Sequence, residues 1–173
     1  AEGQLWIYYQ EFPSNDIESF GGSVDLYFSA SSLERISAAI KPPIWTPAEA
    51  PWSGNLRVWA RPRYGQRYTI GADPNDRGYD RAVAWVMESI TGRHVASLRS
   101  ATWSPYQFAA LLRDLGHLYA ADPNQEESWA LLAPERNNSG IAVIEALEKV
   151  WKYRNLYRTR NPRKQFTGCL TNS

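Results

Sequence analysis

The stretch YTIGADPNDRGYD, residues 68–80, decides the fold that this sequence predicts. The apolar residues Tyr68, Ile70 and Ala72 alternate with smaller or polar ones, and this alternation is typical of a β-strand. Asp73 takes the last position of the strand, and further acidic, amide and glycine residues follow it. An Asx turn that leads into a hairpin explains this run, and so does one half of a binding site. The stretch alone leaves both interpretations open.

Two more strands follow this acid-rich turn. The nearly continuous apolar run of residues 82–88 predicts a central strand, and residues 93–99 predict a third strand, joined to it by the turn ITGR. A fourth strand is predicted for the apolar residues 128–133, SWALLA. Strands one to three, each joined by a short turn, favour antiparallel pairing, whereas the fourth strand follows a helix and is expected to run parallel.

Two helices accompany these strands. The segment TWSPYQF starts the first, with Ser104 as N-cap, Pro105 at the first helical position and Gln107 completing a capping box. Asn138 or Ser139 is expected to cap the second. Its apolar face is predicted to consist of Ile141, Ile144, Leu147 and Trp151. The fold class is therefore α/β, with a mixed sheet and flanking helices.

The chain divides into three parts by composition. Residues 1–40 are acidic and aromatic, with a possible helix at 31–40; residues 41–66 form a proline-rich connector with one short strand at 55–60; and residues 67–173 hold the alternating strands and helices. At 173 residues with 43% hydrophobic content, the chain is long enough to bury a substantial core.

Charge is distributed unevenly along the chain. The first 34 residues hold six acids and no Lys or Arg, so in a chain of net charge +1 the remainder carries +7. An acid-free basic run near the C-terminal end contains Lys152, Arg154, Arg158, Arg160, Arg163 and Lys164. Such a run attracts a polyanion such as nucleic acid, although a solvated surface is an equally good interpretation of charge alone.

Composition also excludes several kinds of chemistry. Cys169 is the single cysteine, so no internal disulfide forms, and the absence of long apolar runs or a signal-like start leads us to expect a soluble intracellular protein. With His94 and His117 as the only histidines, zinc or triad chemistry lacks ligands. No Gly-x-x-x-x-Gly-Lys-Ser/Thr motif is present, which excludes a P-loop in this chain.

A second acid stands at a position equivalent to that of Asp73. Glu135 follows the predicted fourth strand in LLAPERNNSG, although Arg136 or the helix N-terminus can account for it structurally. If the first and fourth strands are neighbours, Asp73 and Glu135 lie about 5 Å apart, since this is the spacing of adjacent strands. Two such carboxylates favour a hard cation between them, and Mg²⁺ or Mn²⁺ suits oxygen ligands better than zinc does.

Together, the segments YTIGADPNDRGYD, GRHVASLRS and LAPERNNSG, with NLY and FTGCLTN after them, resemble the nuclease domain of the large terminase subunit of tailed bacteriophages. YYQEFPSNDIESF, residues 8–20, is similar to the segment that follows the ATPase domain in that family. The resemblance implies a ribonuclease-H-like fold and an endonuclease that uses a two-metal site, holding Mg²⁺ or Mn²⁺, to cut concatemeric double-stranded viral DNA. Asp73 and Glu135 match two catalytic acids of the family, and Asp80 matches a further acid that helps to hold metal.

The same resemblance implies binding partners, and the sequence also differs from the family pattern in two respects. The partners are DNA, the terminase ATPase domain, the small terminase subunit and the portal, in the host cytoplasm and without a membrane. The family's third catalytic aspartate lies downstream of the G-x-x-T segment, beyond Ser173, and the ATPase motifs do not occur here, so we expect a chain trimmed at both ends. A non-catalytic docking or DNA-contact module of a packaging motor, or another ribonuclease-H-like nuclease such as a resolvase, remains the alternative.

Overall fold

The computed structural model describes residues 29–74, 81–159 and 167–169. The chain divides at Pro42 into two units. The described part of the first unit is helix α3 (Ala30–Ala39), whose N-cap Ser29 accepts a hydrogen bond from the backbone N–H of Ser32. Among the described segments, no helix has the length and apolar character of a membrane span.

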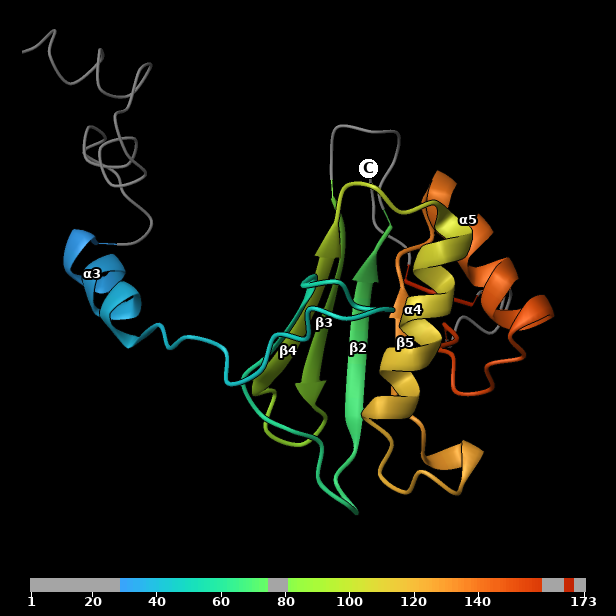
Figure 1. The fold of residues 1–173 in the computed structure, drawn as a ribbon, viewed down its shortest axis with the longest axis horizontal. Helices are drawn as coiled ribbons and strands as arrows, with labels where there is room; N and C mark the ends of the chain where they lie inside the picture. The colour runs from blue at the N-terminus through green and yellow to red at the C-terminus, as the bar shows by residue number, and fades with distance from the viewer. Residues whose placement is uncertain (1–28, 75–80, 160–166, 170–173) are drawn as a thin grey trace, which may run out of the picture. The chain divides into compact units, whose positions relative to one another are not determined.

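The second unit is built on a five-stranded mixed sheet (Figure 1). Its strands are β1 (Leu56–Val58), β2 (Tyr68–Asp73), β3 (Ala82–Glu88), β4 (His94–Ser100) and β5 (Leu131–Pro134), in the spatial order β1-β4-β3-β2-β5. β2, β3 and β4 pair antiparallel, and β5 pairs parallel with β2. This arrangement confirms the predicted mixed sheet, with strands one to three antiparallel and the fourth parallel, and β1 adds an antiparallel edge next to β4.

The helices follow the strands in the predicted order. α4 (Pro105–Leu118) has the capping box of Ser104 and Gln107, with Pro105 in the first turn, as predicted. A short 3₁₀ turn, η1 (Glu126–Ser128), precedes β5, so the fourth strand begins three residues later than predicted. α5 (Asn138–Glu145) continues into a π-helical turn, η2 (Ala146–Val150).

The predicted start and buried face of α5 need correction. Its N-cap is Asn137, one residue before the predicted cap, and Ile141 is 42% exposed. Ile144 and Leu147 are buried as predicted, Trp151 is half-buried, and Gly140 takes the place of Ile141 on the buried face. The face is rotated because Gly140 packs against the backbone of Glu135, which directs Ile141 outward.

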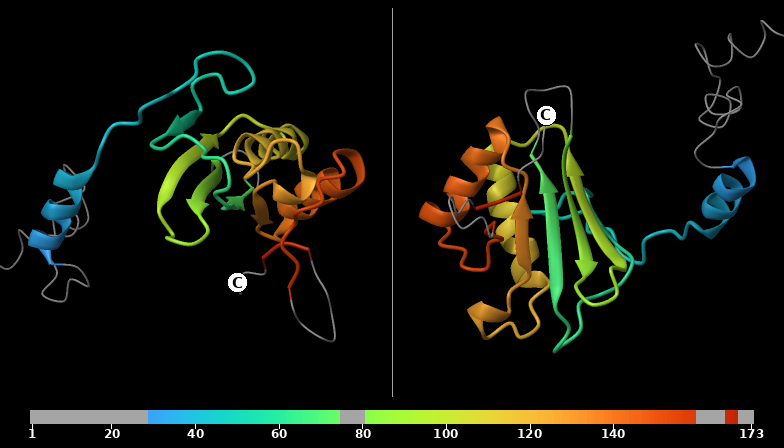
Figure 2. Two further views of the ribbon diagram at one scale, coloured as in Figure 1. Left: turned by 90° about the horizontal axis from the view of Figure 1, so that it is seen from below. Right: turned by 180° about the vertical axis from the view of Figure 1, so that it is seen from behind.

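The two faces of the sheet differ in their cover. Tyr68, Ile70 and Ala72 of β2 are buried on the face that packs against Phe108 and Leu112 of α4. The view from behind in Figure 2 shows the opposite face of the strands in front of the helices. This second face is here called the open face.

The open face changes the interpretation of β3. Residues 82–88 form a central strand, as predicted, but Trp85 is 53% exposed and Met87 38%. β3 is therefore buried on one face only, because the described helices of the second unit cover that face and not the open face. Asp73 and Gly71 pair with Val83 and Trp85 and so share the open face with them.

Both histidines sit between aromatic rings, and their Nε2 atoms are buried without a hydrogen-bond partner in the described part of the chain. His94 contacts Trp59 and Trp85, with ring centroids 4.8 and 4.7 Å away. His117 lies 3.9 Å from the ring centroid of Trp129. Burial lowers the pKa of both histidines below the ordinary value of 6.5.

These lowered pKa values predict acid sensitivity. As the pH falls below about 6.5, the unfolded chain takes up protons that the folded chain resists, so stability is full above that pH and declines below it. We expect the melting temperature to fall between pH 7 and pH 5, before most carboxylates titrate. The His94→Gln/His117→Gln variant should lose most of this decline in a thermal melt followed by circular dichroism. An equally steep decline in the variant would contradict the prediction.

Candidate metal centre at the ends of two parallel strands

Asp73 and Glu135 stand side by side where β2 and β5 end. Ala72 pairs with Pro134 in the parallel register, so the next residues of the two strands, Asp73 and Glu135, are neighbours. The backbone N–H of Glu135 donates to the carbonyl oxygen of Ala72 over 2.7 Å, which extends the pairing to this point. The structure thus brings the two predicted carboxylates to one end of the sheet.

Alternation along the strands decides the face on which these two side chains lie. In β2 the buried residues are Tyr68, Ile70 and Ala72, so Asp73 belongs to the open face, where it is exposed. In β5 Leu132 and Pro134 are buried, so Glu135 lies on the same open face and is half-buried. Two carboxylates on one face of adjacent strands can reach a shared ligand.

The N-terminus of α5 fixes the backbone beneath Glu135. The side chain of Asn137 accepts a hydrogen bond from the N–H of Gly140 over 2.9 Å and caps the helix. A Cβ at Gly140 would meet the carbonyl oxygen of Glu135 at 1.8 Å, which no side chain tolerates. The turn between β5 and α5 therefore requires glycine at position 140.

Cys169 pairs with the end of β5 on the side away from β2. Cys169 donates its N–H to the carbonyl of Pro134 over 2.8 Å, and Arg136 donates its N–H to the carbonyl of Cys169 over 2.7 Å. Gly168, the residue before Cys169, has a φ of +92°, and a Cβ there would lie 2.7 Å from the carbonyl oxygen of Pro134. Glu135 is thus held by neighbouring backbone on both sides.

The cysteine beside Glu135 is poorly suited to metal binding. Burial, and then the charge of Glu135, raises the pKa of the Cys169 thiol. A protonated thiol is a weak ligand, since thiolate is the form that binds metal. The donors at this end of the sheet are therefore carboxylate oxygens, which fit Mg²⁺ or Mn²⁺.

The number of donors in the described ranges is limited. No group of three or more His, Cys, Asp or Glu side chains that could hold a metal occurs among residues 29–74, 81–159 and 167–169. Asp80, the predicted additional ligand, lies outside the described residues. Among the described residues, Asp73 and Glu135 are therefore the two carboxylates that adjacent strand ends bring together.

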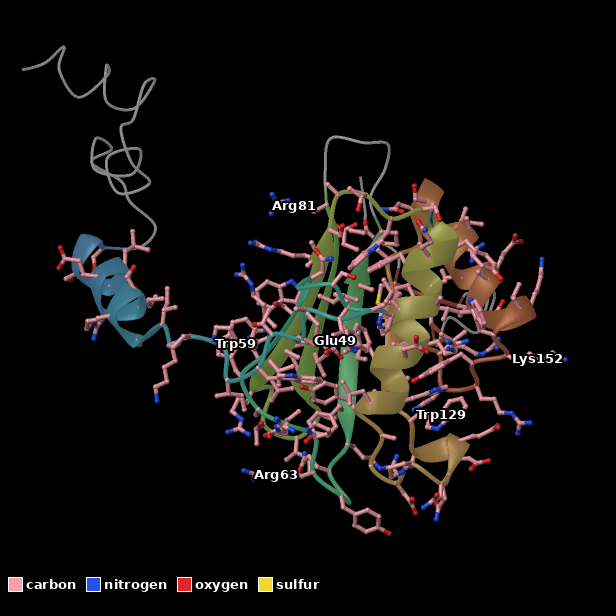
Figure 3. All side chains as sticks on the ribbon, viewed as in Figure 1. Glu49, Trp59, Arg63, Arg81, Trp129 and Lys152 are labelled. Carbon is pink, nitrogen blue, oxygen red and sulfur yellow. The ribbon has the colours of Figure 1, made fainter. Side chains whose placement is uncertain are left out.

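The predicted DNA-binding run lies apart from this site. Lys152 is on the side of the molecule beyond the helices, whereas Arg81 lies at the end toward which β2 runs (Figure 3). Arg154 pairs with Glu126 over 3.1 Å, and Arg158 pairs with Glu148 over 3.4 Å. Glu126 and Glu148, which lie outside the basic run, thus partly neutralise its positive charge. Arg160, Arg163 and Lys164 lie outside the described residues.

Neither Gly140 nor Gly168 stood out as a site residue in the sequence, although both lie in segments that carry the family resemblance. Their importance comes from close approach to the backbone on either side of Glu135. A glycine in the first turn of a helix, three residues after the capping Asn137, was the available signal for the first of them.

Comparison with known proteins was made by sequence and by structure. No protein-family model and no curated protein matches the sequence. Among solved structures, the large terminase nuclease from thermophilic phage G20c overlaps with a TM-score of 0.42 at 19% identity, over 73% of this chain and 83% of that chain. Its zinc-bound form overlaps with a TM-score of 0.42 at 27% identity, over 61% of this chain and 55% of that one. The chain is similar to phage large terminase nucleases.

A further structure of this kind comes from a different phage. The Thermus phage P74-26 large terminase nuclease domain overlaps with a TM-score of 0.37 at 21% identity, over 76% of this chain and 82% of that chain. The overlaps cover most of the chain, but the TM-scores show that the agreement between backbones is partial.

Proposed function

We propose that this chain is the nuclease domain of a phage large terminase subunit, an endonuclease that uses Mg²⁺ or Mn²⁺ to cut concatemeric double-stranded DNA. The observation that carries the proposal is the pair Asp73 and Glu135, adjacent in register on the open face of a mixed sheet. The family motifs in the sequence support it, because these two acids are the ones that match catalytic positions.

In this proposal each part of the site has a separate task. Asp73 and Glu135 hold the cation, and the backbone around Pro134, Gly140 and Cys169 keeps Glu135 in place. A divalent ion, when bound, supplies the Lewis acidity that activates water and stabilises the departing 3′ oxygen. Asp80 is the proposed additional ligand, and the family resemblance implies a third catalytic acid.

The surroundings follow from the same proposal. The basic residues Lys152, Arg154 and Arg158, with those that follow them, would contact the DNA backbone without reading its sequence. The partners would be the ATPase domain, the small terminase subunit and the portal, in the cytoplasm of the infected host. A non-catalytic docking module is the alternative, and it predicts no specific metal site.

Calorimetric titration with Mn²⁺ and Mg²⁺ tests the proposal on the chain itself. We expect a specific site of millimolar affinity or better, weakened at least about tenfold in Asp73→Asn and in Glu135→Gln, since each removes a charged ligand. Glu145→Gln is the matched control, because Glu145 is an exposed acid on α5 that pairs with Lys149. Absence of binding, or unchanged binding in both site variants, would favour the docking module.

A further inference from the structure

Three arginines line a pocket beside the proposed metal centre. The pocket has a volume of about 280 Å³ at the edge formed by β1 and β4. Arg57 comes from β1, Arg99 from β4, and Arg81 from the residue before β3. Its remaining lining residues are small or polar: Gly54, Asn55, Ser100 and Ala101. A pocket of this composition suits an anion better than an apolar molecule.

The pairing of the strands places this pocket on the open face with the two carboxylates. Asp73 pairs with Val83, and Val83 pairs with Arg99, so the three lie in one row across the sheet. Arg99 is two strands from Asp73, which corresponds to about 10 Å between their backbones. Arg57 is exposed one strand further out, opposite Ser97 of β4, on the same face.

These guanidinium groups differ from the basic run at 152–164 in their pairing. Within the described ranges, Arg57, Arg81 and Arg99 form no ion pair, whereas Arg154 and Arg158 each pair with a glutamate. Three positive charges around one pocket, with no ion-pair partner among the described residues, repel each other and attract an anion. The planar guanidinium forms two parallel hydrogen bonds with a phosphate, which Lys does not.

We propose that the Arg57–Arg81–Arg99 pocket binds a backbone phosphate of the DNA strand that the Asp73–Glu135 site cuts. The inference rests on the proposed nuclease function. It places the DNA strand across the open face, from Asp73 and Glu135 toward β1. Phosphates of one strand rise about 3.4 Å per nucleotide along the duplex axis, so about 10 Å corresponds to roughly three nucleotides. One strand can thus reach the carboxylates and the arginine pocket together.

Fluorescence anisotropy with a short fluorescein-labelled DNA duplex in EDTA tests this proposal without metal or catalysis. We expect Arg57→Ala/Arg81→Ala/Arg99→Ala to raise Kd at least about tenfold at low salt. Between about 50 and 200 mM NaCl, the slope of log K against log salt should become shallower by roughly one, since the pocket holds one phosphate and each phosphate contact contributes about 0.9. The Arg81→Ala/Arg99→Ala variant should show an intermediate loss.

The matched control removes two arginines from the opposite end of the sheet. Arg63 and Arg67 precede β2 and are exposed, and Figure 3 shows Arg63 at the end opposite Arg81. Arg63→Ala/Arg67→Ala should leave Kd within about twofold of the unaltered chain, whereas Arg81→Ala/Arg99→Ala should not. Equal losses of DNA affinity in the two double variants would overturn the proposal, because the losses would then come from the change in net charge and not from a specific site. Thermal melts show whether each variant is folded.

Two further results separate the possible failures. In the first, inorganic phosphate raises the melting temperature of the unaltered chain but not that of the triple variant, while the triple variant keeps its DNA affinity. This pair of results would assign the pocket to a small anion and overturn the proposal. Asp73→Asn/Glu135→Gln should retain DNA binding in EDTA, since it removes negative charge from the open face. Absence of metal binding by the unaltered chain would therefore contradict the nuclease proposal alone, and unchanged DNA binding in the arginine variants would contradict this inference alone.

Discussion

Plasmid nicking that depends on Mn²⁺ is expected to fall at least about a hundredfold when either Asp73 or Glu135 is replaced by alanine. Each carboxylate stands at the end of a strand, and the register Ala72–Pro134 makes the two side chains neighbours on one face. Removing either one takes away a charged ligand that the described part of the chain does not replace with a third acid. The loss should therefore be severe in both variants and should not add in the double variant.

The assay belongs on the full gene product, because the resemblance implies a third catalytic acid besides Asp73 and Glu135. Supercoiled plasmid converted to open circles at a series of Mn²⁺ concentrations gives the rate for each variant. Glu145→Ala supplies the control, since Glu145 pairs with Lys149 on the surface of α5, and its nicking rate should equal that of the unaltered protein. Undiminished nicking by either site variant would end the proposed assignment.

Gly140→Ala is expected to destabilise the second unit and to disturb the metal centre together. The new methyl group would meet the carbonyl oxygen of Glu135 at 1.8 Å and its carbonyl carbon at 3.0 Å. Alanine favours a helix over glycine by about 1 kcal/mol, but a clash with backbone atoms cannot be relieved by a side-chain rotation. The clash should outweigh the propensity, with a net loss of about 1–3 kcal/mol in urea denaturation and weaker Mn²⁺ binding.

Gly71→Ala is the matched control for this substitution. Gly71 lies in β2 on the open face, and a Cβ there would meet nothing within 4 Å. Its replacement should leave the free energy of unfolding unchanged or raise it by about 0.4–1 kcal/mol, because alanine has less conformational freedom in the unfolded chain. If Gly140→Ala unfolds at the same urea concentration as Gly71→Ala, the steric account of the β5–α5 turn is wrong.

Much of the architecture was predictable because its signals are local. The alternation of Tyr68, Ile70 and Ala72 identifies β2, and the capping box of Ser104 and Gln107 identifies the start of α4. The errors lie where two local signals compete. The apolar SWALLA segment predicts a longer strand, yet η1 occupies residues 126–128 and β5 begins at Leu131. Asn137, Asn138 and Ser139 can each cap a helix, and tertiary packing at Gly140 selects Asn137.

The sequence by itself determined the order of strands and helices, the parallel fourth strand and the two acids that follow strands, since each depends on residues close together in the chain. Only the tertiary structure decided that β3 is exposed on one face, that Gly140 fits against Glu135, and that Arg57, Arg81 and Arg99 share a pocket. The reason is that strand pairing brings together residues more than 40 positions apart, such as Arg57 and Arg99, and their register is set by packing across the sheet.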